Sequence, residues 1–278
     1  EPAHSIWNLT GPRDNLILDP RGHLKTTIIT ISHSIQWIIN FPDIRILLSM
    51  ATGDQVTKVA QEILGHFRFN NKFRWLFPEF CPKARVAKDF GNIEGFTVPC
   101  RTRKWMKEPT ISTCSVGKVV AGGHYEVLKH SDLVDKENVK TPNQIREVID
   151  HFNYLDPLIE RGPIPPHHGW QDVEGTRYDF GDLYGYIRKR EEEATIKTWQ
   201  IHIRSAVQKD GTALWSTRLP LQELERIKAK DLYIFSAQYL NRPVPVGSGL
   251  ATEEEIVWVP RKIVRSLISL GELRDLLE

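Results

Sequence analysis

Nine residues near the start of the chain combine residue types that bind phosphate. Segment 19–27 reads Asp-Pro-Arg-Gly-His-Leu-Lys-Thr-Thr and follows a short apolar run. A standard phosphate loop has the pattern G-x-x-x-x-G-K-[ST] between a strand and a helix. Lys25 and Thr26 match its last two positions, but the first glycine is replaced by Asp19 and the second by Leu24. The alternative is an ordinary turn that carries an exposed lysine.

The rest of the loop favours phosphate binding over a plain turn. An exposed lysine does not explain why Arg21, Gly22 and a threonine pair occur together where a helix is expected to begin. In a phosphate loop, backbone N–H groups and the helix N-terminus surround the phosphate oxygens, and the lysine neutralises their charge. We therefore expect a nucleotide to contact Gly22, His23, Leu24, Lys25, Thr26 and Thr27.

A nucleotide hydrolase also needs carboxylates that hold Mg²⁺ and activate water. The candidate is Asp132, at the end of a segment that reads as a strand, but the position before it is Ser131. Lys129 and His130 interrupt the apolar run of that segment, which is unusual for a central parallel strand. An aspartate that caps a turn is the alternative interpretation.

Other kinds of site have little support. The three cysteines form no C-x-x-C pair, and His167 and His168 are adjacent rather than at metal-binding helical spacing. The sequence is 40% hydrophobic and 26% charged, which is typical of a folded domain. Its formal net charge of +2 restricts any DNA-binding surface to local basic stretches, for which the candidates are 101–104 and 188–190.

The elements that must position these residues alternate between strand and helix. Apolar runs and helical spacing predict strands at 16–18, 44–49, 127–128 and 198–206, and helices at 25–40, 55–67, 142–155 and 219–230. Segments 110–115 and 117–121 read as two strands joined at a turn, and 162–170 as a loop. This order is typical of an α/β domain with a parallel sheet.

Five segments together resemble the ATPase portion of the large terminase subunit of tailed bacteriophages, the motor that packages DNA into the prohead. "DPRGHLKTT" resembles the variant phosphate loop of that family, and "GGHYEVLKHSDLVDKENVKTPNQIREV" resembles its Walker B segment. Three further segments follow the order of the family: "ILLSMATGDQVTKVAQEI", "EGTRYDFGDLYGYI" and "LYIFSAQYLNRPV". The resemblance covers most of the chain, from Leu16 to Val259.

The resemblance implies a role for each matching residue. Lys25 would contact the β- and γ-phosphates of ATP, Thr26 would bind Mg²⁺, and Arg21 would lie near the phosphates. Asp132 would be the second Walker B acid, which activates water and lies at the metal. Thr176 and Arg177 would belong to the motif that couples hydrolysis to movement.

The resemblance also implies a fold and partners. We expect a P-loop NTPase-like α/β domain over 1–243, with a mainly parallel sheet and helices on both faces, followed by a linker or lid over 244–278. The expected partners are double-stranded DNA, the portal protein and the small terminase subunit, with assembly into a homo-oligomeric ring. No run of 18 apolar residues predicts a membrane span, and the expected location is the cytoplasm of the bacterial host.

Two departures from the family leave alternatives open. Ser131 stands where the family has the Mg²⁺-binding aspartate, so hydrolysis could be weakened or lost. The nuclease that follows the ATPase in the family is expected to be absent, because Asp275 lies in a Leu-rich segment that reads as a helix, and the start at Glu1 is typical of a fragment. The alternatives are a catalytically impaired prophage remnant and a helicase-like scaffold.

Overall fold

A computed structural model of the chain describes residues 12–85, 87–118, 122–162 and 169–243. Residues up to Pro243 belong to one compact unit. Segment 244–278, with the strand expected at Ile256–Val259, lies outside the described residues, and so do His167 and His168. The predicted linker or lid therefore stays a prediction.

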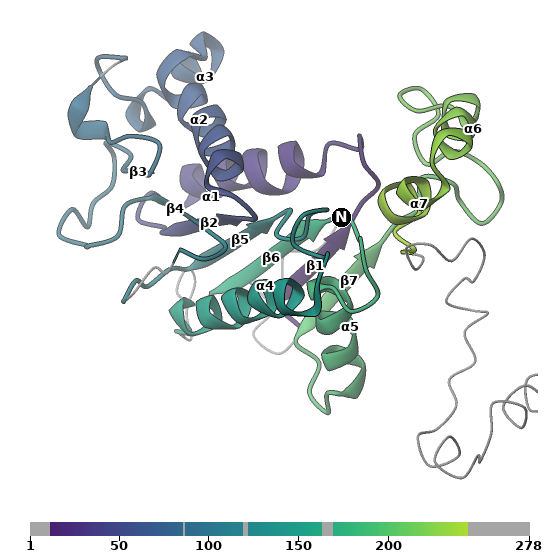
Figure 1. Cartoon of the computed structure of the whole chain (residues 1–278). Coiled ribbons are helices and arrows are strands. Elements are labelled where there is room, and N and C mark those ends of the chain that lie inside the picture. Colours follow the sequence, from purple (N-terminus) through teal and green to yellow (C-terminus); the bar gives the residue numbers. More distant parts are fainter. Residues whose placement is uncertain (1–11, 86, 119–121, 163–168, 244–278) are drawn as a thin grey trace, which may run out of the picture. The chain divides into compact units, whose positions relative to one another are not determined.

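Within the described residues, seven strands form one sheet in the order β3-β4-β2-β5-β6-β1-β7 (Figure 1). All neighbouring strands pair in parallel, apart from the antiparallel pair of β3 and β4. The strands are β1 (Asp14–Leu18), β2 (Ile46–Met50), β3 (Gly95–Phe96), β4 (Ile111–Ser115), β5 (Val127–Ser131), β6 (Trp170–Gly175) and β7 (Trp199–Ile203). The fold is α/β, as the sequence predicts.

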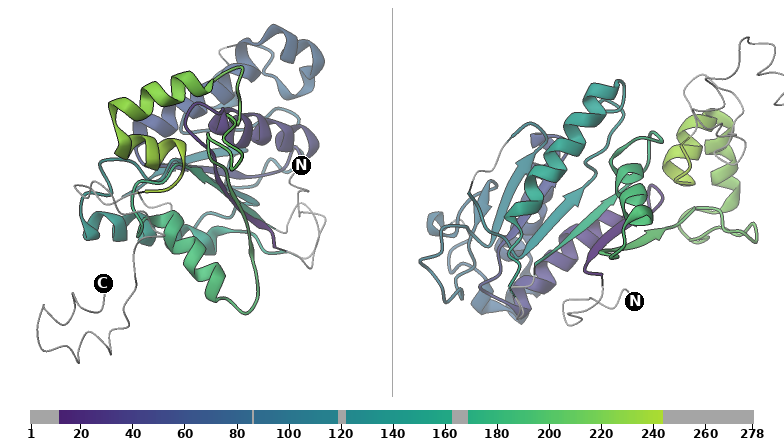
Figure 2. Two further views of the ribbon diagram at one scale, coloured as in Figure 1. Left: turned by 90° about the vertical axis from the view of Figure 1, so that its right-hand side faces the viewer. Right: turned by 90° about the horizontal axis from the view of Figure 1, so that it is seen from below.

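Helices cover both faces of the sheet (Figures 1 and 2). On one face, the π-helix η2 (Thr26–Ser32), α1 (His33–Asn40) and α2 (Gly53–Phe69) pack on an apolar cluster that includes Ile46, Ile111 and Val127. On the other face, α4 (Pro142–Leu155) and α5 (Leu183–Glu193) pack on Leu16, Leu18 and Val173. The side chains of the central strands are consequently buried on both faces.

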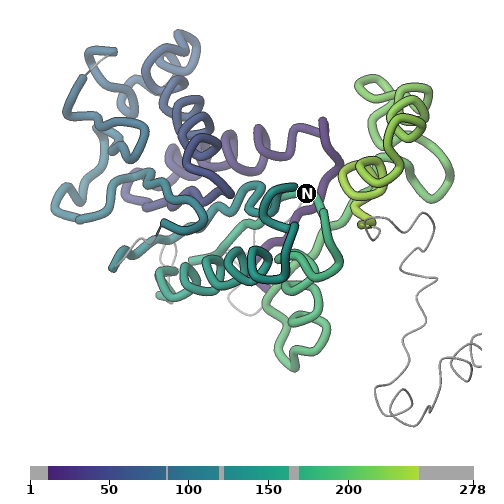
Figure 3. The backbone as a smooth tube through the Cα atoms, in the orientation of Figure 1, coloured from purple at the N-terminus to yellow at the C-terminus, as the bar shows by residue number. Residues whose placement is uncertain are grey.

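Shorter elements complete the described chain. They are α3 (Asn71–Leu76), the 3₁₀ turns Pro78–Phe80, Lys88–Phe90 and Asp156–Leu158, α6 (Leu221–Lys230), α7 (Leu232–Ile234) and the π-helix η6 (Phe235–Tyr239). Figure 3 shows that α6 and α7 follow β7 at the edge of the sheet. A small apolar cluster around Ala206, Leu224 and Phe235 holds this part together.

Most predicted elements are confirmed, but the predicted hairpin is wrong and one central strand was not predicted. The hairpin expected from 110–121 does not form, because β4 pairs with β2 and β3 while Val116 and Gly117 make a turn. Residues 119–121 lie outside the described residues. Strand β6 was not predicted at all, although it is a central strand. The helix expected from Lys25 begins at Thr26 as a π-helix and becomes α-helical at His33.

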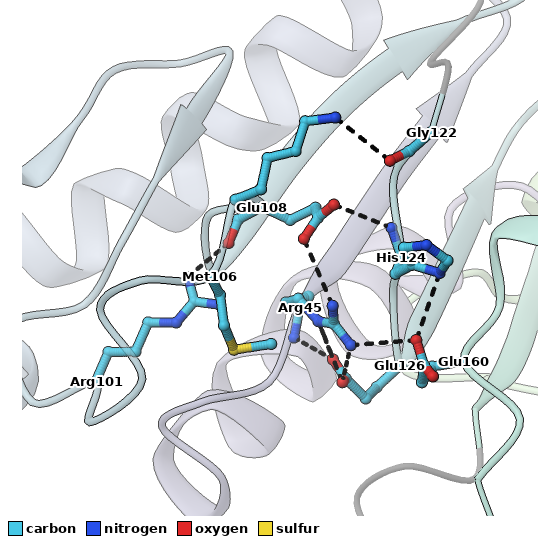
Figure 4. Close-up of polar contacts among 9 residues, drawn as sticks. Arg45, Arg101, Met106, Glu108, Gly122, His124, Glu126 and Glu160 are labelled. Atoms are coloured by element: carbon cyan, nitrogen blue, oxygen red, sulfur yellow. Dashed lines mark hydrogen bonds and ion pairs between the residues drawn. The ribbon is translucent and has the colours of Figure 1, made fainter.

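A buried cluster of charged side chains lies at the N-terminal ends of β2 and β5 (Figure 4). The Arg45 guanidinium lies 2.6 Å from Glu126 Oε1, and 3.5 Å from carboxylate oxygens of both Glu108 and Glu160. The backbone N–H of Arg45 donates to the second oxygen of Glu126 at 2.7 Å. Both oxygens of Glu126 are therefore hydrogen-bonded inside the protein.

Candidate nucleotide site

The opposite edge of the sheet, where the parallel strands end, brings the predicted phosphate loop and Asp132 together. Strand β6 lies between β1, which leads into the loop, and β5, which ends immediately before Asp132. The chain passes from β1 over one face toward β2, and from β6 over the other face toward β7. In open α/β sheets, a ligand crevice lies where connections diverge in this way.

Two residues of the loop itself have a left-handed backbone conformation. Gly22 and Leu24 have φ values of +83° and +59°, which is the left-handed region. A Cβ at Gly22 would meet nothing within 4 Å, so the conformation rather than space favours glycine there. The helix begins at Thr26, and the N–H groups of a first helical turn have no partner within the helix. Successive N–H groups in such a loop can bind an anion.

Lys25 points from the loop toward two carboxylates. Its Nζ atom lies 3.1 Å from Asp132 Oδ1 and 4.0 Å from Glu174 Oε2, and its side chain is only 12% exposed. Burial lowers the pKa of Lys25, but attraction to Asp132 and then Glu174 outweighs this effect and raises the pKa overall. The lysine is thus a fully charged group held at the end of the strands.

Asp132 has an unusual backbone for a residue at a strand end. Its φ is +43°, a conformation that aspartate adopts more readily than most residues, and its N–H donates to the carbonyl of Glu174 at 2.9 Å. Its side chain is 30% exposed, in contrast to the fully buried Ser131 before it. Asp132 is therefore the more exposed of the two carboxylates beside Lys25.

Glu174, on β6, lies beside Lys25 and was not predicted from the sequence as a residue of this site. Its side chain is 1% exposed, and Oε1 accepts hydrogen bonds from the hydroxyls of Ser131 and of Thr30, the latter at 3.1 Å. Among the described residues, Oε2 has no hydrogen-bond partner. Burial and then repulsion by Asp132 raise the pKa of Glu174 to about 7, although Lys25 lowers it. The next residue is Gly175, where any Cβ would collide with the Tyr184 ring of α5.

Arg21 is linked to the segment around Thr176 through Gln238. Its guanidinium donates to Gln238 Oε1 at 2.9 Å, and Gln238 Nε2 donates to the Tyr178 hydroxyl at 3.1 Å. Burial raises the pKa of Tyr178, while the charge of Arg21 and a hydrogen bond with Thr176 lower it in part. Thr176 is buried. The structure therefore connects the loop to one of the two predicted coupling residues.

Arg177, the other predicted coupling residue, is held away from the loop. Its guanidinium is buried, donates to the carbonyls of Asp179 and Phe180 at 3.1 and 3.0 Å, and lies 3.5 Å from Asp182. Its backbone N–H donates to the side chain of Asn241 at 3.4 Å. In this arrangement Arg177 fixes the turn that precedes α5.

A cavity of about 240 Å³ opens beside the loop. It is lined by Asp19, His23, Lys25, Ile28, Ile29, Arg204, Leu214 and Trp215. Asp19, which replaces the first loop glycine, is held by the Arg204 guanidinium at 2.5 and 2.6 Å. Arg218 lies over the Trp215 ring, 5.5 Å from its centroid, and donates to the Gly22 carbonyl. An aromatic ring thus stands directly beside the phosphate-binding candidate.

The described residues hold no cluster of three or more metal-binding His, Cys, Asp or Glu side chains. A site with fewer than three such ligands can still bind Mg²⁺ together with a nucleotide. Mg²⁺ is usually bound by one or two carboxylates, with phosphate and water as its other ligands. The His130 side chain is fully buried, and His124 Nδ1 lies 3.5 Å from a carboxylate oxygen of Glu160. These positions give no support for a separate metal centre.

The two basic stretches differ in exposure. In 101–104, Arg101 is buried and donates to the Glu108 carbonyl, so only Arg103 and Lys104 remain exposed basic groups there. Arg101 is therefore not an exposed candidate for contact with DNA phosphate in this stretch. In 188–190, Arg190 donates to Asn153 and to the Tyr186 hydroxyl.

Neither a family model nor a curated protein matches the sequence. None of the helices in the described part of the chain is both long and apolar enough to cross a membrane.

Proposed function

We propose that the chain is the ATPase portion of a phage large terminase subunit, with a P-loop NTPase fold, and that it hydrolyses ATP to move double-stranded DNA. The observation that carries the proposal is the 3.1 Å contact between Lys25 and Asp132. The two residues are far apart in the sequence, and each follows a parallel strand at the same edge of the sheet. This is the pair that ATP hydrolysis requires at one place.

The proposed roles follow from the contacts of each side chain. In the presence of ATP, Lys25 exchanges its contact with Asp132 for phosphate oxygens, and Asp132 is then available to accept a proton from the attacking water. Thr26 and Asp132 would hold Mg²⁺, which would neutralise charge on the phosphates. Arg21, which donates to Gln238, would bind the outer phosphates.

The cavity beside the loop fits the nucleoside half of ATP in this proposal. The Trp215 ring is 36% exposed and lies with its centroid 6.1 Å from that of His23. An exposed indole next to a phosphate loop offers a surface on which a purine base stacks. Ile28 and Leu214 supply apolar walls for the same cavity.

The proposal also includes the assembly in which such a motor works. Double-stranded DNA would be the substrate for movement, and the portal protein and small terminase subunit would be partners of a homo-oligomeric ring. The site of action would be the cytoplasm of the bacterial host. The basic candidates for contact with DNA are the exposed Arg103, Lys104, Lys189 and Arg190 and the half-buried Arg188.

The direct test is Mg²⁺-dependent ATP turnover with and without double-stranded DNA. We expect turnover that DNA stimulates, and its loss in Lys25→Ala because the phosphates then lack their principal cation. Lys58→Ala is the matched control, since Lys58 lies in an exposed pair with Asp54 on α2. Full turnover in Lys25→Ala would reject this site.

A second candidate function is favoured by Ser131, which brings no charge to the position before Asp132. The chain would then be a catalytically impaired, helicase-like or prophage-derived scaffold that binds nucleotide weakly. It predicts nucleotide binding that depends on Lys25 but no measurable turnover under any DNA condition. Turnover by the unmodified chain would exclude this candidate.

A further inference from the structure

Ser131 and Glu174 are direct partners across the sheet. Strands β5 and β6 pair in parallel, and their register sets Ser131 opposite Glu174. The Ser131 hydroxyl donates to Glu174 Oε1. The Glu174 carboxylate on β6 therefore contacts Ser131, the residue on β5 where a carboxylate was expected and is absent. The uncharged Ser131 and the buried acid Glu174 thus lie on neighbouring strands.

The carboxylate of Glu174 is oriented toward the phosphate loop. Its Oε2 lies 4.0 Å from Lys25 Nζ. Oε1 accepts hydrogen bonds from the hydroxyls of Thr30 and Ser131, which hold the carboxylate in place. Only Oε2 is left without a hydrogen bond among the described residues. Buried polar atoms are nearly always partnered, and an orphaned one points to a specific cause, such as a bound ion.

We infer that Glu174 supplies the metal-site carboxylate that β5 lacks at Ser131, so that the acid of the Mg²⁺–nucleotide site has moved one strand across the sheet. The inference rests on the proposed function, because it concerns the metal that accompanies ATP. Glu174, with Thr26, would bind Mg²⁺ directly or through a water molecule, and Asp132 would remain the acid next to the attacking water. One or two carboxylates suffice for such a site, because phosphate and water complete the coordination.

Two simpler roles for Glu174 agree less well with its contacts. An acid that only stabilised the fold would be expected to have both oxygens bonded, as Glu126 has at the other edge. If Glu174 only paired with Lys25, its carboxylate would be expected at hydrogen-bond distance from Lys25 Nζ. Asp132 Oδ1 lies at that distance, 3.1 Å, whereas Glu174 Oε2 is 4.0 Å away.

The test measures nucleotide binding rather than turnover. ADP is titrated into each protein in the presence of Mg²⁺ and again in the presence of EDTA, and the ratio of the two affinities gives the Mg²⁺ enhancement. We expect Glu174→Gln to lower this enhancement by about 10-fold or more while the affinity in EDTA is unchanged. Glu137→Gln is the control, because Glu137 is an exposed acid paired only with Lys140 in the loop after Asp132.

The decisive variant carries its carboxylate on β5, at position 131, instead of on β6. We expect the double variant S131D/E174Q to regain the enhancement, and the charge-free counterpart S131N/E174Q not to regain it. Failure of S131D/E174Q to exceed S131N/E174Q, or an unchanged enhancement in Glu174→Gln, would overturn the inference. If Glu174→Gln does not fold, S131D/E174Q is compared with the unmodified chain, where an equal enhancement supports the inference and a lost one overturns it. Absence of ADP binding by the unmodified chain in both conditions would instead reject the proposed function.

Discussion

Two buried glutamates at opposite ends of the sheet differ in how well the protein satisfies them. Glu126 precedes β5, and Arg45 donates to both of its oxygens, from its guanidinium and from its backbone N–H. Glu174 lies near the end of β6, has two hydroxyl donors on one oxygen, and has no hydrogen bond on the other among the described residues. The fold satisfies both oxygens of Glu126, whereas it leaves one oxygen of Glu174 without a hydrogen bond among the described residues.

The difference implies opposite effects when each charge is removed. Removal of one partner of a buried ion pair leaves the other charge without compensation and destabilises the fold. Removal of a poorly compensated buried charge relieves a desolvation penalty. Loss of stability at Glu174 would therefore contradict the comparison as clearly as a neutral result at Glu126.

The largest expected effect is that of Glu126→Ala. The free energy of unfolding should fall by about 3–5 kcal/mol, because Arg45 then remains buried with only the more distant Glu108 and Glu160. Denaturant unfolding followed by circular dichroism measures the change. Lys58→Ala is the control, because its pair with Asp54 is 70% and 75% exposed and should contribute less than about 1 kcal/mol. A similar loss in both variants would show that burial of the Arg45 cluster has no special role.

The next effect has the opposite sign. Without nucleotide, Glu174→Gln should raise the free energy of unfolding at neutral pH and above by about 1–3 kcal/mol, because the amide carries no charge into a buried place. The pKa of Glu174 is raised from 4.5 to about 7, so the folded protein keeps a proton that the unfolded chain loses. The contribution of this group to stability should therefore fall as pH rises from 4.5 to about 7.

Unfolding curves across this pH range separate the unmodified chain from the variant. The advantage of Glu174→Gln should be small near pH 4.5 and should reach its full size above the raised pKa of about 7. An advantage that is constant over the whole range would assign the effect to packing rather than to the buried charge.

A mutation in the cavity should change binding while stability stays nearly constant. Trp215 is 36% exposed and lies beside the loop at the ligand end of the sheet. Trp215→Ala should weaken ATP binding by about 1–3 kcal/mol, through loss of a stacking surface. Calorimetric titration measures this change, and Trp75→Ala is the control because that ring is 80% exposed on α3. Equal ATP affinities in the two variants would contradict the assignment of this cavity to the nucleoside.

The smallest expected effect is that of Gln238→Ala. Arg21 loses one hydrogen bond from its guanidinium, and its link to Tyr178 is cut. Turnover should fall by about fivefold, equivalent to roughly 1 kcal/mol, whereas ATP affinity should change little. Steady-state kinetics separate the two quantities. A loss of affinity without a loss of turnover would mean that Gln238 shapes the binding loop rather than the position of Arg21.

The sequence predicts the strands whose residues are apolar and fails at the polar one. Strands β1, β2 and β5 carry apolar runs, and all three were expected. Strand β6 reads Trp-Gln-Asp-Val-Glu-Gly, and its polar side chains find partners on other elements, as Asp172 does with Lys129 at 2.5 Å. Local patterning cannot show such compensation, so the residues of this central strand were not predicted as a strand.

The same limit applies to the site. Lys25 and Asp132 each follow a strand in a recognisable segment, so their meeting could be predicted from the order of the elements. Glu174 carries no local signal, because its relation to Ser131 comes from the register of two strands that are distant in the sequence. The burial of Arg101, which removes it from the DNA-contact candidates, depends likewise on its bond to the carbonyl of Glu108.

Calorimetric titration of Mg²⁺–ATP into the unmodified chain and into Lys25→Ala tests most directly whether the carboxyl edge of the sheet binds nucleotide. We expect saturable binding to the unmodified chain and no detectable heat from the variant, with both proteins equally folded by circular dichroism. Equal affinities in the two proteins, or no binding to either, would contradict the assignment of Lys25 to a nucleotide site.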